Sequence, residues 1–341
     1  MKVAFVKQVL DVHGPLSSVK WNDDPLSLFE VWPGKATLWA ETCILKADWY
    51  VIPQQIITAY TIDAVKKHNR EKVLLERSVT TPLDEIPFED YDLVVTMDPI
   101  LDKELKPVHA YRVIEHWDEL YTQSLEKPLP NRDLFLAHML DAPEDFDALP
   151  ASISFPYLYD PELFLGCFGR NKKNFLWVDW RTFTALGGEP FAWSEKADRA
   201  VEEFTRRVDF PIRFKSDRAR LPYTFSETGE TGDAARYLSQ LAECKFYVGV
   251  GRKSGAGQGL CDAAALGCIC IGDINRPYHR LVCHPECLCS NLREVYYKVN
   301  YVIDSERLHQ EILQWQFERL KTYFLERPLA LLKKAVELKS R

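Results

Sequence analysis

The sequence predicts an α/β protein built from two Rossmann-like domains, each with a parallel β-sheet. Short apolar runs alternate with helical patterns along the chain, as strands and crossover helices do in parallel sheets. This alternation stops near residues 156–174 and then starts again. A length of 341 residues also fits two domains better than one.

The first half of the chain is predicted to contain five strands and two helices. The strands are expected at residues 2–6, 72–75, 92–96, 110–114 and 152–155, and the helices at residues 35–49 and 54–67. The run Asp92-Leu-Val-Val-Thr96 is the clearest buried strand of this half, and it ends at Met97-Asp98.

The second half repeats the pattern with a new set of strands and helices. Strands are expected at residues 174–179, 211–214, 246–250 and 268–271, and helices at residues 194–207, 233–244, 260–266, 293–302, 305–323 and 329–338. The last helix opens after Pro328, where we expect the chain to break and change direction.

A glycine-rich loop precedes one of these helices. Gly255, Gly257 and Gly259 run into a small-residue helix with Asp262 expected in its first turn, and Gly267 is expected to end that helix. Glycine lets a loop lie close to a ligand, and the N–H groups that open a helix attract anions. The loop therefore predicts a phosphate site. The alternative is that the glycines only permit tight packing, because such a motif alone is weakly specific.

Composition and charge narrow the classes of function. The net charge of −7 argues against a nucleic-acid surface as the main function. No apolar run approaches the roughly 20 residues of a membrane span, and the chain opens on a strand, so a cytoplasmic location is expected. The nine cysteines are expected to be reduced. Those at residues 283–289 crowd too closely with His284 and Glu286 for a structural zinc site.

Several stretches resemble the GT-B glycosyltransferases, particularly the retaining bacterial sugar transferases. Residues 262–271 resemble the family's donor helix and the strand that follows it, and residues 156–164 are similar to its interdomain segment. Val113-Ile-Glu-His116-Trp-Asp118 resembles a strand end of the first domain, and His13-Gly14-Pro15 resembles the glycine loop after the first strand. The stretch from His284 onward resembles the run into the last helices.

The resemblance implies a domain plan and an activity. Residues 1–165 are expected to form an acceptor-binding domain, residues 166–322 a nucleotide-sugar domain facing it across a cleft, and residues 323–341 a helix that returns to the first domain. The implied reaction moves a sugar from a nucleotide-sugar to a hydroxyl of a glycan, lipid-linked sugar or small molecule, as in polysaccharide biosynthesis. No metal and no nucleic acid are expected as partners. The resemblance leaves the oligomeric state open and is compatible with peripheral membrane contact.

The resemblance also assigns the donor site. The residues that it places around the nucleotide-sugar are Arg181, Arg252, Lys253, Ser254, Gly255, Gly257, Gln258, Gly259 and Asp262. The backbone of the glycine loop would meet the phosphates, the cations would offset charge on the leaving group, and Asp262 would meet the ribose. Ser254 stands where the family often has an acid, and no lysine follows Arg181 as the family pattern requires. The donor's identity stays open for these reasons.

Three residues of the first half are the catalytic candidates. His116 matches a family histidine that contacts the donor sugar. His13 matches a loop histidine that serves as general base in inverting relatives, a role that its pKa suits. Asp98 follows a buried strand at the expected cleft. The strand end at His116 and the interdomain segment favour retention of configuration, whereas His13 favours inversion.

Other functions stay open. A sugar-nucleotide epimerase shares this fold, and Ser254 would fit a nucleotide-binding protein that has lost catalysis. A dinucleotide oxidoreductase fits less well, because its glycine motif belongs after the first strand, where Gly14 stands alone.

Overall fold

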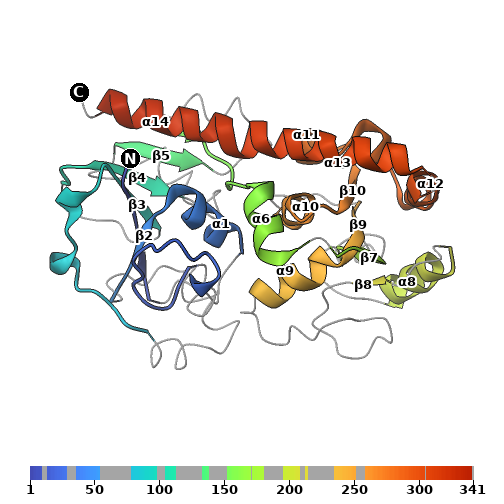
Figure 1. Ribbon diagram of the computed structural model, residues 1–341, viewed down its shortest axis with the longest axis horizontal. Coiled ribbons are helices and arrows are strands. Elements are labelled where there is room, and N and C mark those ends of the chain that lie inside the picture. Colours follow the sequence, from blue (N-terminus) through green and yellow to red (C-terminus); the bar gives the residue numbers. More distant parts are fainter. Residues whose placement is uncertain are drawn as a thin grey trace. The chain divides into compact units, whose positions relative to one another are not determined.

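The chain forms two compact units in a computed structural model (Figure 1). The structure describes residues 1–9, 14–28, 36–53, 78–97, 104–112, 133–137, 152–169, 171–179, 195–207, 212–213, 234–250, 258–303 and 305–339. Unit 1 comprises Met1–Leu158 and Glu326–Arg341, and unit 2 comprises Tyr159–Leu325. The divisions predicted from the sequence lie after residues 165 and 322.

Unit 1 is built on a parallel sheet of six strands. They are β1 (Val3–Gln8), β2 (Asp48–Ile52), β3 (Leu93–Met97), β4 (Val108–Arg112), β5 (Leu134–Ala137) and β6 (Ser152–Ser154), in the order β2-β1-β3-β4-β5-β6. The order reverses between β1 and β3, so the carboxyl ends of these two strands form the topological switch point, where open α/β sheets bind ligands.

Short helices and one long helix accompany this sheet. They are α1 (Ala36–Leu45), the 3₁₀ turns η2 (Leu83–Glu85) and η3 (Phe88–Asp90), and α14 (Arg327–Lys339). Ile86 and Phe88 join Ala4, Val6 and Val94 in a buried cluster on one face of the sheet. The C-terminal helix α14 contacts β6 and therefore belongs to unit 1.

The predicted helix at residues 35–49 is wrong at its C-terminal end. Helix α1 stops at Leu45, Lys46 takes a positive φ of 50°, and Asp48–Ile52 is the strand β2, paired with β1. The aromatic and β-branched residues Trp49-Tyr-Val-Ile52 favour this strand. Strand β5 was also not predicted from the sequence.

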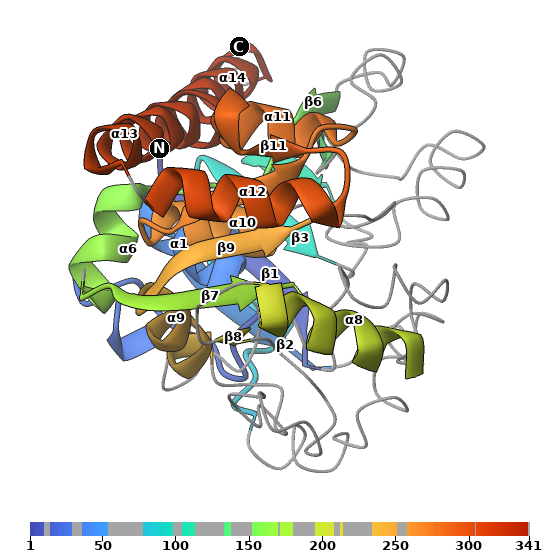
Figure 2. The ribbon, with the colours of Figure 1, turned by 90° about the vertical axis from the view of Figure 1, so that its right-hand side faces the viewer.

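Unit 2 repeats the architecture with a parallel sheet of five strands (Figure 2). They are β7 (Lys173–Val178), β8 (Ile212–Arg213), β9 (Cys244–Gly249), β10 (Ile269–Asp273) and β11 (Leu288–Cys289), in the order β11-β10-β9-β7-β8. The order reverses between β7 and β9, which places a second switch point at their carboxyl ends.

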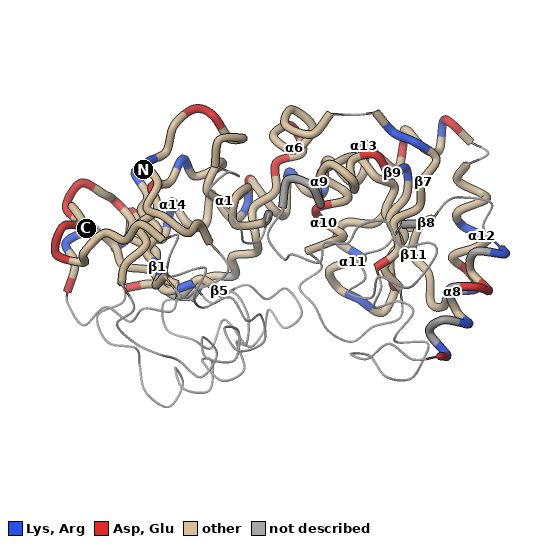
Figure 3. Tube along the Cα trace, turned by 90° about the horizontal axis from the view of Figure 1, so that it is seen from below, with Lys and Arg blue, Asp and Glu red and all other residues tan. Residues whose placement is uncertain are grey.

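Helices surround the second sheet. They are α6 (Pro161–Phe168), α8 (Glu195–Arg207), α9 (Ala234–Ala242), α10 (Gln258–Ala265), α11 (Pro277–Val282), η4 (Pro285–Cys287), α12 (Leu292–Ile303) and α13 (Glu306–Lys321). Phe204 of α8 and Val295 of α12 join the strand residues Leu176, Phe246 and Ile269 in one buried core. Helix α8 carries both acidic and basic residues (Figure 3).

The chain stays helical where a break was predicted at Pro328. A π-helical stretch, Thr322–Glu326, links α13 to α14 directly. Pro328 is the second residue of α14 and follows the π-helical stretch directly, so the residue without a backbone N–H lies where the helical hydrogen-bond pattern changes. Two parallel sheets with helical crossovers confirm the predicted fold class of two Rossmann-like regions. Among the described residues, no helix is long and apolar enough to cross a membrane.

Candidate functional site

The switch point of unit 2 brings together an acidic residue, Asp179, and the N-terminus of helix α10. Asp179 directly follows β7, and its backbone N–H donates to Val248 O of β9 at 2.8 Å. β9 then leads through residues 251–257, which lie outside the described residues, to α10 at Gln258. The N-terminus of α10 thus belongs to the edge of the sheet where a ligand is expected.

Tyr247 of β9 connects this acid to the helix start. Its hydroxyl donates to Oδ2 of Asp179 at 3.4 Å. Burial, followed by the charge of Asp179, raises the pKa of Tyr247 well above its ordinary value, so the hydroxyl stays protonated.

Close packing against two tyrosines explains why residue 259 is glycine. A Cβ at this position would lie 2.8 Å from the Tyr247 hydroxyl and 3.7 Å from the Tyr237 hydroxyl. The first turn of α10 can therefore approach these tyrosines only without a side chain. Tight packing is one established role of this glycine, alongside the phosphate role that the sequence predicts.

Asp262 is buried and held by two tyrosines. It is 4% exposed, and its Oδ1 accepts the Tyr159 hydroxyl at 3.1 Å while Oδ2 accepts the Tyr237 hydroxyl at 3.2 Å. Burial, followed by the charge of Asp262, raises the pKa of both tyrosines well above the ordinary value. Asp262 lies in the second turn of α10, not the first as predicted, because the helix already begins at Gln258. Gly267, with φ of 73°, follows the helix end as predicted.

His279 is a neutral histidine at the same edge of the sheet. It lies in α11, and its Nδ1 accepts the N–H of Asp273, the last residue of β10, at 2.8 Å. Burial, helped by the charge of Arg276 and opposed by Asp273, lowers the pKa of His279 to about 4. With Nδ1 as acceptor, the proton of the neutral ring is on Nε2. The ring also packs close to Gly272, where a Cβ would lie 3.0 Å from Nδ1.

Unit 1 holds a buried ion pair at the carboxyl end of β4. Arg112, the last residue of that strand, donates to Oε2 of Glu41 in α1 at 2.9 Å and to Phe155 O at 3.2 Å. Both charged side chains are fully buried. Burial raises the pKa of Glu41 to about 7 against the opposing charge of Arg112. Glu41 Oε1 and Arg112 Nε have no hydrogen-bond partner among the described residues.

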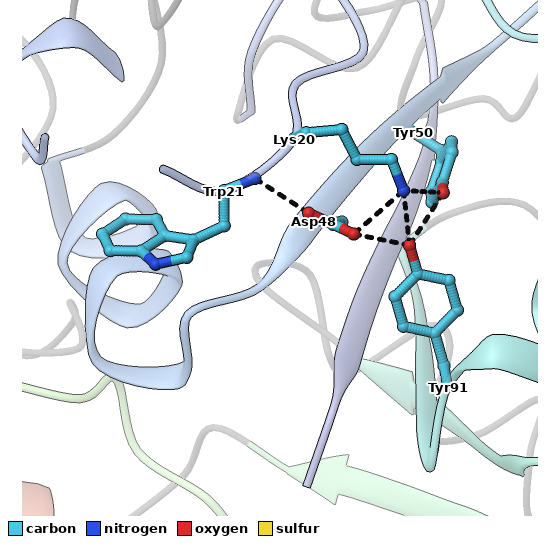
Figure 4. A network of polar contacts seen from close by, with 5 residues as sticks. All are labelled: Lys20, Trp21, Asp48, Tyr50 and Tyr91. Atoms are coloured by element: carbon cyan, nitrogen blue, oxygen red, sulfur yellow. Dashed lines mark hydrogen bonds and ion pairs between the residues drawn. The ribbon is translucent and has the colours of Figure 1, made fainter. Parts of the chain in front are cut away.

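A second polar cluster of unit 1 lies around the first residue of β2, at the amino edge of the sheet (Figure 4). Lys20 Nζ contacts Asp48 Oδ2 at 2.9 Å and the hydroxyls of Tyr50 and Tyr91, and Trp21 N–H donates to Asp48 Oδ1 at 2.8 Å. Burial works against ionisation of Asp48, but the hydrogen bonds from Tyr91, Trp21 and Lys20 hold its pKa below the ordinary value. The amino edge is opposite the ligand-binding edge, so we assign this cluster to structure.

The structure describes three of the predicted site residues, and all three lie in α10: Gln258, Gly259 and Asp262. The remaining candidates lie outside the described residues: His13, Asp98, His116, Arg181, Arg252, Lys253, Ser254, Gly255 and Gly257. Sequence reasoning missed five residues of this edge: Tyr159, Asp179, Tyr237, Tyr247 and His279. Only Asp179 carried a signal that could have been used, an acid at the end of a predicted buried strand.

The cysteines of residues 283–289 are buried and free. Burial is the main cause that raises the pKa of the Cys287 thiol to about 12, so it stays protonated. In the described part of the chain, no group of three or more His, Cys, Asp or Glu side chains could hold a metal ion. Metal independence stays a prediction.

Solved structures share this fold over nearly the whole chain, although no family model and no curated protein matches the sequence. An alpha-glucosyltransferase in complex with UDP and a 13-mer DNA with a central A:G mismatch has a TM-score of 0.54 at 9% identity, covering 98% of this chain and 100% of that chain. The complex with UDP and a 13-mer DNA containing an HMU base has a TM-score of 0.54 at 9% identity, covering 98% and 99%. The complex with UDP has a TM-score of 0.52 at 9% identity, covering 98% and 100%. The expected GT-B fold is confirmed.

These comparisons correct one expectation. Two of the structures with this fold contain DNA, so the expectation that no nucleic acid is among the partners is wrong. The net charge of −7 had argued against nucleic acid, but net charge averages over the surface and does not report a local basic groove.

Proposed function

We propose that this protein transfers a sugar from a UDP-sugar to a hydroxyl group carried by DNA. The observation that carries the proposal is the fold, which 98% of the chain shares with an alpha-glucosyltransferase bound to UDP and DNA. The polar switch point of unit 2 supports it independently, because donor nucleotides of α/β sheets bind at such edges.

The donor's diphosphate would bind at the N-terminus of α10 and along the glycine loop before it. The unpaired N–H groups of a helix start carry partial positive charge, which offsets the charge of a leaving diphosphate. Arg181, Arg252 and Lys253 are the proposed cations that add to this field. Ser254, Gly255 and Gly257 belong to the proposed loop.

Asp262 is proposed to act by positioning rather than by charge alone. Its two tyrosine hydrogen bonds tie α10 to Tyr159 and Tyr237, so the helix start keeps a fixed place. Fixed donors stabilise a developing charge better than mobile ones, because they need no rearrangement during the reaction. A ribose contact of Asp262 stays a prediction from the family resemblance.

The acceptor side is proposed to lie in unit 1. His116 would contact the transferred sugar, and His13 and Asp98 are the candidates to accept the proton of the attacking hydroxyl. Retention of configuration is our expectation, with no metal ion required. The alternatives are an epimerase of the same fold and a nucleotide-binding protein without turnover.

An assay with UDP-glucose and a duplex carrying hydroxymethyl groups on its pyrimidines tests the proposal. We expect a DNA product heavier by one sugar, and its anomeric proton coupling reports retention or inversion. An isomerised UDP-sugar without transfer would support the epimerase. A melting temperature raised by UDP without turnover would support the lapsed binding protein. Transfer to a glycan but not to DNA would contradict the proposed acceptor.

A thermal-shift screen identifies the nucleobase of the donor nucleotide. UDP is expected to raise the melting temperature more than GDP, ADP, TDP or CMP, and Asp262→Ala is expected to abolish that rise. Since Asp262→Ala also removes a buried carboxylate, Asp262→Asn serves as the control that keeps the side chain's shape. A rise that persists unchanged in both variants would mean that the donor site is elsewhere.

A further inference from the structure

A groove between α8 and α12 of unit 2 carries a concentration of positive charge. Its volume is about 710 Å³, and the charged side chains that line it are Lys196, Arg199, Arg207, Arg293 and the single acid Glu203. The chain as a whole has a net charge of −7, whereas this groove is lined by four cations and one carboxylate. The lining is therefore complementary to a polyanion.

Packed aromatic rings, tilted by 51° to each other, join the two helices at this groove. Phe204 of α8 and Tyr296 of α12 have ring centroids 5.1 Å apart, and both are buried. The Arg207 guanidinium lies over the Tyr296 ring at 5.4 Å. The groove is thus anchored in the core of unit 2 and does not depend on a loop.

The cations of the groove are available to a ligand. Lys196 and Arg293 form no ion pair with any other described residue. Arg207 pairs with Glu203, the acid of the groove, at 2.8 Å, with side chains that are 52% and 54% exposed. Arg199 pairs with Glu195 at 3.7 Å, with side chains that are 76% and 91% exposed. Exposed pairs of this kind contribute little in water, so a phosphate can replace the carboxylate at small cost.

The outer face of α12 adds an aromatic surface beside the groove. Arg293, Tyr297 and Tyr301 follow at four-residue spacing and share one face of the helix. Tyr297 is 74% exposed and Tyr301 is 50% exposed, and their rings stack with centroids 6.5 Å apart at 7°. Proteins bind unpaired nucleic acid with two components: exposed flat rings stack on the bases, and nearby cations contact the backbone.

The two helices of the groove begin near the edge of the sheet that holds the proposed donor site. Lys196 is in the first turn of α8, which follows β7, and Arg293 is in the first turn of α12, which follows β11. Helices that follow parallel strands begin near the carboxyl ends of those strands. Figure 2 shows α8 reaching beyond the carboxyl ends of β7 and β9, and Figure 3 shows the basic positions along both helices.

We propose that this groove binds the sugar-phosphate backbone of the nucleic-acid acceptor, with Lys196 and Arg293 on phosphates and Tyr297 and Tyr301 stacking on unpaired bases. The inference rests on the proposed function for its choice of partner. It goes further by assigning the contact surface to unit 2, outside every residue of the predicted site. A neutral glycan would use the tyrosines but would leave Lys196 and Arg293 without a counter-charge.

Fluorescence anisotropy with labelled oligonucleotides of about 16 nucleotides, the upper site size of a single-strand-binding fold, tests this surface. Lys196→Glu with Arg293→Glu is expected to weaken binding of single-stranded and duplex DNA at least tenfold. The slope of log affinity against log salt should become shallower by about 2 for duplex DNA, since each lost phosphate contact accounts for about 0.9. Tyr297→Ala with Tyr301→Ala is expected to weaken single-stranded binding about fivefold or more and duplex binding less.

The matched control reverses the same charges elsewhere. Lys333 and Lys334 are exposed on α14, and Lys333→Glu with Lys334→Glu is expected to change affinity less than twofold. If the two charge-reversal variants weaken binding equally, or if the wild type binds no DNA, the inference is overturned. The same holds if a sulfated polysaccharide binds the groove as tightly as DNA does.

A second readout separates this inference from the proposed function. The rise in melting temperature with UDP is expected to be unchanged in all three double variants, which also shows that they fold. Loss of DNA binding in the groove variants alone supports the surface even if no sugar is transferred. Sugar transfer to DNA that is unaffected by the groove variants overturns the surface and leaves the proposed activity standing.

Discussion

Tyr159 donates its hydroxyl to Oδ1 of Asp262 at 3.1 Å, although the two residues lie 103 positions apart in the sequence. Tyr237 donates to the other oxygen of the same carboxylate at 3.2 Å. A buried carboxylate with a donor on each oxygen joins the segment before α6, helix α9 and helix α10 at one point. The start of α10, where the donor phosphates are proposed to bind, depends on this junction.

Each of these tyrosine hydroxyls is expected to stabilise unit 2. Tyr159→Phe and Tyr237→Phe should each lower the free energy of unfolding by about 1.5–3 kcal/mol, the usual range for a hydrogen bond to a charged group. Urea unfolding measures the change. Tyr301→Phe, on an exposed ring, is the control and should change stability little. Equal effects of all three substitutions would contradict the role given to Asp262.

Contact with Tyr247 explains the glycine at position 259 and can be tested by rescue. Gly259→Ala places a methyl group 2.8 Å from the Tyr247 hydroxyl and is expected to destabilise the protein by about 1–3 kcal/mol through overpacking. Tyr247→Phe removes that oxygen and should recover part of the loss in the double variant.

Gly166 is the control for this pair. It lies in α6, and a Cβ added there would have no neighbouring atom within 4 Å, so Gly166→Ala should stabilise by up to about 1 kcal/mol through helix propensity. Thermal unfolding compares the variants. A Gly259→Ala protein as stable as the wild type, or one not rescued by Tyr247→Phe, would show that the close approach is not required.

Some of this fold follows from local sequence. The apolar runs at 92–96 and 246–250 predicted strands that the structure places at Leu93–Met97 and Cys244–Gly249, because a buried parallel strand is recognisable by its continuous apolar side chains. Strand β2 was missed because it follows α1 after only two residues, Lys46 and Ala47, so both elements appear as one apolar stretch.

The candidate site was predictable only in part. The glycine loop marked the start of α10, since glycine and small residues leave a pattern along the chain. The partners of Asp262 left none, because Tyr159 reaches it only through the tertiary fold. The sequence also does not show which face of the sheet a strand tyrosine such as Tyr247 occupies.

The buried pair of unit 1 should behave differently from an exposed one. Arg112→Met leaves the fully buried Glu41 without a counter-charge and is expected to cost about 3–5 kcal/mol. Glu41→Met with Arg112→Met removes both charges and should cost much less. The exposed pair of Lys173 and Glu243, at 2.8 Å, is the control, and Lys173→Met should cost at most about 1 kcal/mol. If the double substitution costs as much as Arg112→Met and Glu41→Met added together, the two residues are not coupled and this account is contradicted.

His279 is expected to make stability depend on pH. Its pKa falls from 6.5 in the unfolded chain to about 4 in the folded one, so the unfolded state binds more protons between these values. Stability from this group is present above pH 6.5 and is lost as the pH falls toward 4.

His279→Asn keeps an acceptor for the Asp273 N–H and removes the titration. The stability of the wild type relative to this variant is expected to fall by up to about 3 kcal/mol between pH 7 and pH 4. Urea unfolding of both proteins across this range measures it. Glu41, whose pKa is raised to about 7, acts in the opposite direction but is present in both proteins, so it cancels in the difference. A difference that does not change with pH would contradict the neutral state of His279.

Hydrogen–deuterium exchange with and without UDP tests most directly whether the donor binds at the switch point of unit 2. We expect slower exchange in peptides that span residues 250–262, from the end of β9 into α10, when UDP is bound. Slower exchange confined to peptides of unit 1, with residues 250–262 unaffected at a saturating UDP concentration, would contradict donor binding at this switch point.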